Sequence, residues 1–298
     1  MFFKKKNNSS LYLSDKPPLS FGGKVMLALS YLVLIIWALL IIVPLVEMVL
    51  GSFNGAQAKY IIANGEWKFS LNHFKFLINE TLFLRWVVNT IYVAVLTAAI
   101  NLIVVSLTGY VYSRYRFKGR KASLMAIMLI QVIPAFGGII AYFTMYQIIN
   151  AVVPLFSRQM MLILIYAIGG IATNTFILKG YIDSISTELD EAAQIDGCSS
   201  LQIYRLIIMP IARPMLSIIA LWSFIGPFMD YLLPSVLLTN TKTYTLAAGL
   251  FTLISDERTL NQTAFAAGGL LTAIPIVILF MYLQRDLVSG LAKGSVKG

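Results

Sequence analysis

Runs of apolar residues close to the length of a membrane-crossing helix constrain this chain more than any other sequence feature. A helix needs about 20 mostly apolar residues to cross roughly 30 Å of hydrocarbon. Five runs reach this length, and a sixth is shorter and rich in glycine but ends in an unbroken apolar stretch. The predicted spans are residues 25–49, 86–107, 122–146, 160–178, 215–238 and 264–281. The sequence therefore predicts an all-α, polytopic membrane protein with about six transmembrane helices.

Composition excludes several other classes of protein. Hydrophobic residues make up 58% of the 298 residues and charged residues only 12%, whereas a soluble domain carries about 25% charged residues. The net charge of +10 fits topogenic Lys and Arg near anionic lipid better than nucleic-acid binding. Cys198 and His73 are the single cysteine and histidine, which excludes an intramolecular disulfide and a Cys- or His-based metal cluster. We expect His73 to be solvated in an outer loop.

Lysine and arginine predict the orientation of the spans. The first apolar run is too long for a signal-peptide core and is interpreted as a retained helix. Six spans bring both termini to one side, and the positive-inside rule selects the cytoplasm. The two richest basic segments on that side are Lys4, Lys5, Lys6, Lys16 and Lys24, and Arg114, Arg116, Lys118, Arg120 and Lys121. The predicted organisation is a cytoplasmic tail (1–24), a transmembrane domain (25–298), a cytoplasmic loop (179–213) and a C-terminal tail (285–298).

The loop 179–213 differs from the rest of the chain because acidic residues are concentrated in it. Its pattern predicts a helix, a tight turn and a second helix. Thr187 can cap the first helix, whose first turn is acidic, and Gly197 stands where a left-handed residue ends a helix. Ser199 and Gln202 have the spacing of a capping box, and Pro210 and Pro214 are expected to mark the end of the second helix and the re-entry into the membrane.

Small residues lie along one side of the first loop helix. Leu189, Ala193 and Gly197 recur at every fourth position, so this side is small near the end of the helix, and a small face lets another protein approach the backbone closely. The alternative interpretation is an ordinary amphipathic helix that merely connects two spans. The chemistry of the residues leaves both open.

A longer motif resembles the EAA loop of ABC-importer permeases. It consists of Glu191-Ala192-Ala193, three residues, Gly197, nine residues and Ile207-Ile208-Met209-Pro210, with Met209 where leucine is usual. Segments 115–121, 226–230 and 290–298 extend the resemblance over most of the chain. Together they resemble the smaller permease subunit of maltose/maltodextrin-type carbohydrate importers. The resemblance implies the ABC-importer permease fold.

The resemblance also implies partners and contact residues. Glu191, Ala192, Ala193 and Gly197 would form a coupling helix seated in a cleft of an ATP-binding subunit, and Asp196 would cap or pair there. A second tail contact between the ATPase subunits would come from Ser295, Val296, Lys297 and Gly298. The implied partners are a second permease subunit, two ATP-binding subunits and an extracellular sugar-binding protein, whose cleft the outer loop 239–263 would probe. No cofactor is expected on this chain, and ATP and Mg are expected in the partner ATPase subunits.

Polar residues inside the predicted spans give two interpretations of a substrate path. Asp230 follows Gly226-Pro227, where a broken helix would expose backbone groups, so the carboxylate is either functional or a partner for those groups. Thr90, Thr97, Asn101 and Thr108 form a stripe roughly 40° wide on one helix. They either hydrogen-bond sugar hydroxyls or hold neighbouring helices together. The glycine and polar residues at 169–175 and the pair Gln131 and Pro134 indicate less regular helix.

The sequence therefore predicts a permease subunit of an ATP-driven importer of carbohydrate, with a maltodextrin-like oligosaccharide as the expected substrate. The chain lacks a phosphate-binding P-loop, so ATP hydrolysis is expected in a partner. One alternative is an ion-coupled secondary transporter, which requires paired ionisable groups at the midplane. Another is a membrane-embedded enzyme, which requires a catalytic cluster. The expected location is the bacterial cell membrane, with both termini cytoplasmic.

Overall fold

Helices make up almost all of the described structure. The computed structural model describes residues 20–55, 67–131, 135–256 and 260–294. Within these ranges the only β pairing is an isolated bridge between Asn54 and Phe69. The helical elements are α1 (Phe21–Ser52), α2 (Asn72–Glu80), α3 (Phe83–Arg114), α4 (Arg120–Ile130), η2 (Ala135–Gly138), α5 (Ile139–Val152), α6 (Arg158–Asp183), α7 (Glu188–Ile195), α8 (Ser200–Gln202), η3 (Ile203–Ile208), α9 (Met209–Met229), α10 (Leu232–Leu237), η4 (Thr241–Thr243), α11 (Leu246–Phe251) and α12 (Gln262–Gly294).

Five of the described helices are long and apolar enough to cross a membrane: α1, α3, α6, the stretch Ser200–Met229 and the Gln262–Asp286 part of α12. This confirms an all-α polytopic membrane protein. Several helices run beyond the predicted spans. The helix α1 begins at Phe21 and ends at Ser52, and α12 continues to Gly294, so most of the predicted C-terminal tail is helical.

The third predicted span, 122–146, is not one helix. It is divided into α4, the 3-10 turn η2 and α5. The sequence between α4 and α5 contains Pro134, Gly137 and Gly138, which disfavour a continuous helix because proline lacks a backbone donor and glycine has low helix propensity. The Gln131 side chain joins the end of α4 to α6, donating to the Gly169 carbonyl over 2.7 Å and accepting from the Thr173 hydroxyl over 2.5 Å.

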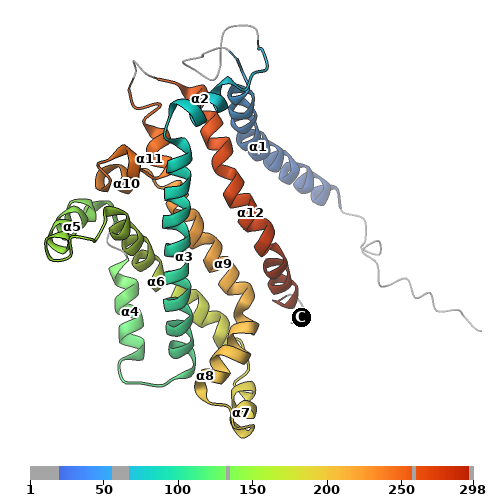
Figure 1. Ribbon diagram of the computed structural model, residues 1–298. Helices are drawn as coiled ribbons and strands as arrows, with labels where there is room; N and C mark the ends of the chain where they lie inside the picture. Colours follow the sequence, from blue (N-terminus) through green and yellow to red (C-terminus); the bar gives the residue numbers. More distant parts are fainter. Residues whose placement is uncertain (1–19, 56–66, 132–134, 257–259, 295–298) are drawn as a thin grey trace, which may run out of the picture. The chain divides into compact units, whose positions relative to one another are not determined.

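The chain divides into two units, Met1–Leu50 and Gly51–Gly298. In the second unit, α3 packs along α6 and α9, and α9 packs along α12 (Figure 1). Among the described residues, α3 contributes to each of three buried apolar clusters. Glycines allow the α3–α6 contact to be close. A Cβ on Gly109 would lie 3.0 Å from the Leu178 side chain, and one on Gly170 would lie 2.7 Å from Asn101 Nδ2. The helix α6 is continuous through this region, so the irregularity predicted at 169–175 is wrong.

The helix that follows the 179–213 loop continues through Pro210. The path runs from α8 through the π-helical η3 into α9, with Pro210 in the first turn of α9. At the end of η3, the Met209 amide donates to the Tyr204 carbonyl, five residues earlier. Pro210 clashes with the carbonyl of residue 206 in a regular α-helix, and a wider π turn relieves such crowding. Pro214 also lies inside α9, so the prediction that Pro210 and Pro214 mark the end of the second loop helix is wrong.

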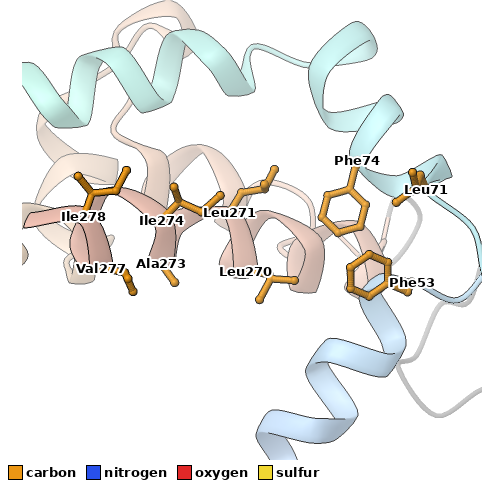
Figure 2. Close-up of a pocket in the computed structure, with 9 residues that line it drawn as sticks. All are labelled: Phe53, Leu71, Phe74, Leu270, Leu271, Ala273, Ile274, Val277 and Ile278. Atoms are coloured by element: carbon orange, nitrogen blue, oxygen red, sulfur yellow. The ribbon is translucent and has the colours of Figure 1, made fainter. Parts of the chain in front are cut away.

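The described residues of the second unit also form an open apolar groove of about 450 Å³. Figure 2 shows its lining from the segment after α1, from α2 and from α12. The residues are Phe53, Leu71, Phe74, Leu270, Leu271, Ala273, Ile274, Val277 and Ile278. A lining of this kind suits hydrocarbon rather than sugar hydroxyls, because it offers almost no hydrogen-bonding groups.

Candidate functional site

The segment Ser184–Ile208, between α6 and α9, contains the predicted EAA-type motif except for its last two residues, Met209 and Pro210, which begin α9, and we call this segment the connecting loop. Its first helix, α7, has Glu188, Asp190 and Glu191 in the first turn, where the helix dipole favours negative charge. The predicted cap at Thr187 is wrong, because its side chain makes no capping hydrogen bond. Ser186 serves instead, its hydroxyl accepting from the Glu188 amide over 3.3 Å.

The turn between α7 and α8 follows the sequence prediction closely. Gly197 has φ of +83°, the left-handed conformation that favours glycine. Its amide donates to the Gln194 carbonyl over 3.0 Å, and the Cys198 amide donates to the Ala193 carbonyl over 2.9 Å. Ser199 and Gln202 form the predicted capping box, with the Ser199 amide donating to the Gln202 side chain over 2.7 Å. The relative direction of α7 and α8 is therefore fixed by local hydrogen bonds.

Of the residues on the predicted small face of α7, Ala193 faces the protein's own bundle rather than outward. Ala193 is only 5% exposed and belongs to the buried cluster that also contains Ile185 and Ile203. Glu191 and Ala192 are exposed. The prediction of a single small outer face along Leu189, Ala193 and Gly197 is therefore wrong. The face available to another molecule lies on the opposite side of the helix.

Large apolar side chains are exposed on the connecting loop. Ile195 is 86% exposed, Leu201 68% and Leu206 63%. They lie close in sequence to the exposed Glu191, Asp196 and Gly197. A surface that combines exposed apolar groups with acidic groups is typical of a protein-binding site. The connecting loop can therefore bind a partner that offers apolar and basic groups.

One arginine joins the connecting loop to α3. Arg114 Nε lies 2.5 Å from Asp190 Oδ2, a close ion pair. Its two terminal nitrogens donate to the carbonyls of Ile182 and Ile185 over 3.2 and 3.1 Å. The sequence pattern predicts only a topogenic role for Arg114. The signal that would have found it is its place at the end of a long apolar run, opposite a loop rich in carboxylates.

The polar stripe on α3 makes contacts between helices. The Thr90 hydroxyl accepts from the Leu246 amide over 2.6 Å. Asn101 donates to the Ala167 carbonyl and accepts from Asn174, both over 2.8 Å. These are the contacts that the helix-joining interpretation predicts. Thr108 lies 2.8 Å from Thr175 between the hydroxyl oxygens, and Thr97 is buried with no hydrogen-bond partner for its hydroxyl.

Asp230 lies at the end of α9 and caps α10. Its Oδ1 accepts from the amides of Leu232 and Leu233 over 2.9 and 3.3 Å, and its Oδ2 accepts from the Tyr166 hydroxyl over 2.9 Å. The helix does not break at Gly226-Pro227 but continues to Met229. The carboxylate therefore satisfies backbone groups where α9 gives way to α10, as one of the two sequence interpretations predicted.

His73 is buried, so its predicted solvation is wrong. It is 3% exposed and lies one helical turn before the buried Leu77 on α2. Its Nε2 donates to the Asn54 carbonyl over 2.8 Å, and its Nδ1 lies 3.4 Å from the Thr263 hydroxyl. The amphipathic pattern of α2 turns His73 inward with Leu77, which a single histidine in a polar segment did not reveal.

The outer loop predicted at 239–263 folds back onto α3 in its described part. Trp86 Nε1 donates to the Thr241 carbonyl over 2.8 Å, and Asn89 donates to the carbonyls of Lys242 and Tyr244. In α11, Leu246 and Leu250 are buried. This loop is therefore attached to the bundle along much of its length. Ser295, Val296, Lys297 and Gly298, predicted as a second coupling contact, lie outside the described residues.

Two comparisons relate the sequence to known proteins. The family model described as "Binding-protein-dependent transport system inner membrane component" matches residues 103–293, more than half of the chain. The maltodextrin transport system permease protein MdxG of Bacillus subtilis is 40% identical over 271 residues, covering 90% of this chain and 95% of that protein. The galactooligosaccharides transport system permease protein GanQ of the same organism is 39% identical, covering 92% and 96%.

A solved structure has the same fold. A chain of a bacterial ABC transporter involved in the import of the acidic polysaccharide alginate superimposes with a TM-score of 0.73 at 22% identity, covering 91% of this chain and 99% of that one. At this identity the likeness concerns the arrangement of helices. It confirms the permease fold predicted from the sequence.

Proposed function

The chain belongs to the family of inner-membrane components of binding-protein-dependent transport systems, and on this premise we propose that its connecting loop couples an ATPase to carbohydrate import. The chain is a multi-pass protein of the bacterial inner membrane and a non-catalytic permease subunit of an ABC importer. Its relatives of about 40% identity are permeases for maltodextrin and galactooligosaccharides. The proposed substrate is accordingly a neutral oligosaccharide of the maltodextrin type.

The observation that carries this proposal is the outward face of the connecting loop. Glu191 and Ala192 are exposed on a helix whose other side is fixed to the bundle through Ala193 and Asp190. Nearby, Ile195 is almost fully exposed. A helix held on one side and open on the other can dock into a cleft and pass on its movement. Glu191, Ala192, Asp196 and Gly197 are the proposed contact residues, with Ala193 as the inner anchor.

The proposed assembly contains a second permease subunit, two ATP-binding subunits and an extracellular sugar-binding protein. ATP and Mg bind in the ATPase subunits, and the connecting loop and both termini face the cytoplasm. The basic segment Arg116–Lys121 supports this orientation, because it lies at the same end of α3 as the connecting loop and basic loops favour the cytoplasmic side. The C-terminal residues Ser295–Gly298 are a second proposed contact with the ATPase.

An ion-coupled secondary transporter, the alternative raised by the sequence, is not supported. The relatives are permeases of the ABC-importer type. In addition, Asp230 uses both carboxylate oxygens on backbone amides and a tyrosine, and the described residues contain no group of three His, Cys, Asp or Glu placed to hold a metal ion. The carboxylate therefore stabilises the fold through these hydrogen bonds and does not form an exchangeable ion site.

The proposed substrate path runs along the polar side of α3 and past Asp230. Thr97 supports this, because its buried hydroxyl has no protein partner and a sugar hydroxyl is a suitable one. Thr90 and Asn101 are already bonded to α11 and α6. They would reach sugar only after the helices separate, which alternating access requires.

The test is a charge reversal on the outward face of α7. Glu191→Lys is compared with Glu188→Lys, a matched exposed residue on the same helix, in proteoliposomes that contain the co-expressed importer. Uptake of radiolabelled maltotetraose is measured with and without ATP. We expect Glu191→Lys to lower ATP-dependent uptake on the order of tenfold or more, within the range typical of coupling between sites, while the membrane content of the chain is unchanged. Equal uptake by both variants and the wild type would contradict the docking role of Glu191.

A further inference from the structure

The connecting loop is attached to α3 by two separate sets of contacts. Arg114, the last residue of α3, forms the first set. Its guanidinium reaches Asp190 on α7 and the carbonyls of Ile182 and Ile185, which lie at the end of α6 and just before α7. This one side chain therefore joins the end of α3 to α6, to the segment before α7 and to α7 itself. Arginine suits this role because its planar guanidinium carries five donors in a fixed arrangement.

The second set holds the other half of the loop. Ser106 and Tyr204 lie 2.8 Å apart between their hydroxyl oxygens, and Tyr110 donates to the Ser200 carbonyl over 3.4 Å. The rings of Tyr110 and Tyr204 are 5.2 Å apart. These contacts connect α3 to α8 and η3. Both halves of the loop, before and after Gly197, are thus held by residues of the same helix.

The ion pair in the first set is sheltered from solvent. The side chains of Arg114 and Asp190 are 10% and 11% exposed. Exposed ion pairs contribute little to stability, but removing one partner of a buried pair leaves an uncompensated charge. Arg114 also satisfies two carbonyls that a shorter, single-headed lysine cannot reach together with the carboxylate. The pair therefore fixes the direction of α7 relative to α3.

Beyond the loop, α3 is bonded to other helices along its length. Asn101 joins it to α6, and Thr90 and Trp86 join it to the segment that contains η4 and α11 at its other end. A displacement of α3 would therefore reach both α6 and the segment that contains η4 and α11.

We infer that Arg114 is a positioning residue for energy coupling, which makes α3 the helix that receives the movement of the connecting loop. When an ATP-binding subunit moves α7, the Arg114–Asp190 contact carries α3 with it. This inference rests on the proposed function, because it assumes an ATPase docked on the loop. It assigns to Arg114 a role distinct from docking, since the side chain is buried behind α7 and does not belong to its outward face.

The test compares Arg114→Lys with Arg116→Lys in the assembled importer in proteoliposomes. Arg116 lies two residues further on and is exposed, so its exchange is the matched control. Maltotetraose uptake and ATP hydrolysis are measured together, and hydrogen exchange of the α7 amides is followed in the same preparation. We expect Arg114→Lys to lower the sugar transported per ATP on the order of tenfold, within the range for coupling between sites. Exchange of α7 should rise, and Arg116→Lys should match the wild type in both.

A second variant separates positioning from folding. Arg114→Lys combined with Asp190→Glu lengthens the carboxylate arm by one methylene and restores its reach to the shorter cation, so part of the lost transport per ATP should return. The inference is overturned if Arg114→Lys lowers uptake and hydrolysis together, in proportion to the amount of assembled importer, because that result indicates a folding defect alone. An unchanged ratio with unchanged α7 exchange also overturns it. Absence of ATP-dependent uptake by the wild type would instead overturn the proposed function.

Discussion

Asp230 offers a sharp test of whether a carboxylate at the end of a membrane helix is structural or takes part in transport. Its Oδ1 caps α10 through the amides of Leu232 and Leu233, and its Oδ2 accepts from Tyr166 on α6. Asparagine caps a helix about as well as aspartate, and its side chain has the same shape. We therefore expect Asp230→Asn to keep the cap and to weaken only the bond to Tyr166.

The magnitudes follow from these contacts. Losing a helix cap to alanine costs about 0.5–2 kcal/mol, and a hydrogen bond to a charged group contributes about 1.5–3 kcal/mol. Asp230→Ala, which loses both, should lower the free energy of unfolding by about 2–5 kcal/mol, and Asp230→Asn by about 1 kcal/mol. Tyr166→Phe should remove the same contact from the other side. Its effect should therefore not add to that of Asp230→Asn, as expected for residues in direct contact.

The assay is a double-mutant cycle of Asp230→Asn and Tyr166→Phe, measured by unfolding the purified protein in mixed micelles and by ATP-dependent sugar uptake. Asp230→Asn should transport at close to the wild-type rate with an unchanged pH profile. If Asp230→Asn abolishes uptake while remaining folded and assembled, the charge itself takes part in transport and the structural reasoning is refuted. Additive effects in the cycle would show that the Tyr166 contact is not the stabilising one.

Three further predictions concern positions where the backbone or packing leaves little freedom. Gly170→Ala should destabilise by about 1–3 kcal/mol, because the new methyl group would lie 2.7 Å from Asn101 Nδ2 and overpacking costs that much. Gly169→Ala meets nothing within 4 Å, so in the same thermal unfolding assay it should stabilise by about 0.4–1 kcal/mol, because alanine has the higher helix propensity. Gly197→Ala should strain the left-handed turn by about 1–2 kcal/mol and reduce uptake, whereas Gly197→Asn should lose less, and equal losses would argue against the turn as the cause. His73→Ala should speed hydrogen exchange in α2 by removing its bond to the segment before it, whereas His73→Gln, which retains a donor, should preserve most of the protection.

Local chemistry in the connecting loop was predictable because short-range rules determine it. The left-handed Gly197 and the capping box of Ser199 with Gln202 each depend on residues within three positions of one another. The direction of α7 was not predictable in the same way. The choice between burying Ala193 and exposing it depends on Ile185 and Ile203, which lie outside α7. A period-four pattern of small residues predicts a face but not which neighbour covers it.

Long apolar runs predicted the membrane class because hydrophobic length is a property of the segment alone. The break in the third run was signalled by Pro134 and the following glycines, but its extent depends on bonds such as that from Gln131 to α6. For a related reason, the burial of Arg114 and His73 was not predictable from the sequence. A charged or titratable side chain is assumed to be solvated unless its partners are known. Those partners, Asp190 and the Asn54 carbonyl, lie 76 and 19 positions away in the sequence.

The π-helical stretch Ile203–Ile208 relates the number of residues in the motif to the direction in which the connecting loop points. A π turn accommodates one residue more than an α-helix over the same rise, so this stretch determines the rotational phase between the connecting loop and α9. Deleting a single residue there, with every contact group retained, would convert the π turn to regular α-helix and leave the direction of Glu191 nearly unchanged, whereas an added residue that no π turn absorbs would rotate Glu191 by about 100° around the helix axis. The nine residues between Gly197 and Ile207 therefore encode an angle: one residue more would redirect the loop without altering its chemistry, and one fewer would remove the π turn that lies just before Pro210.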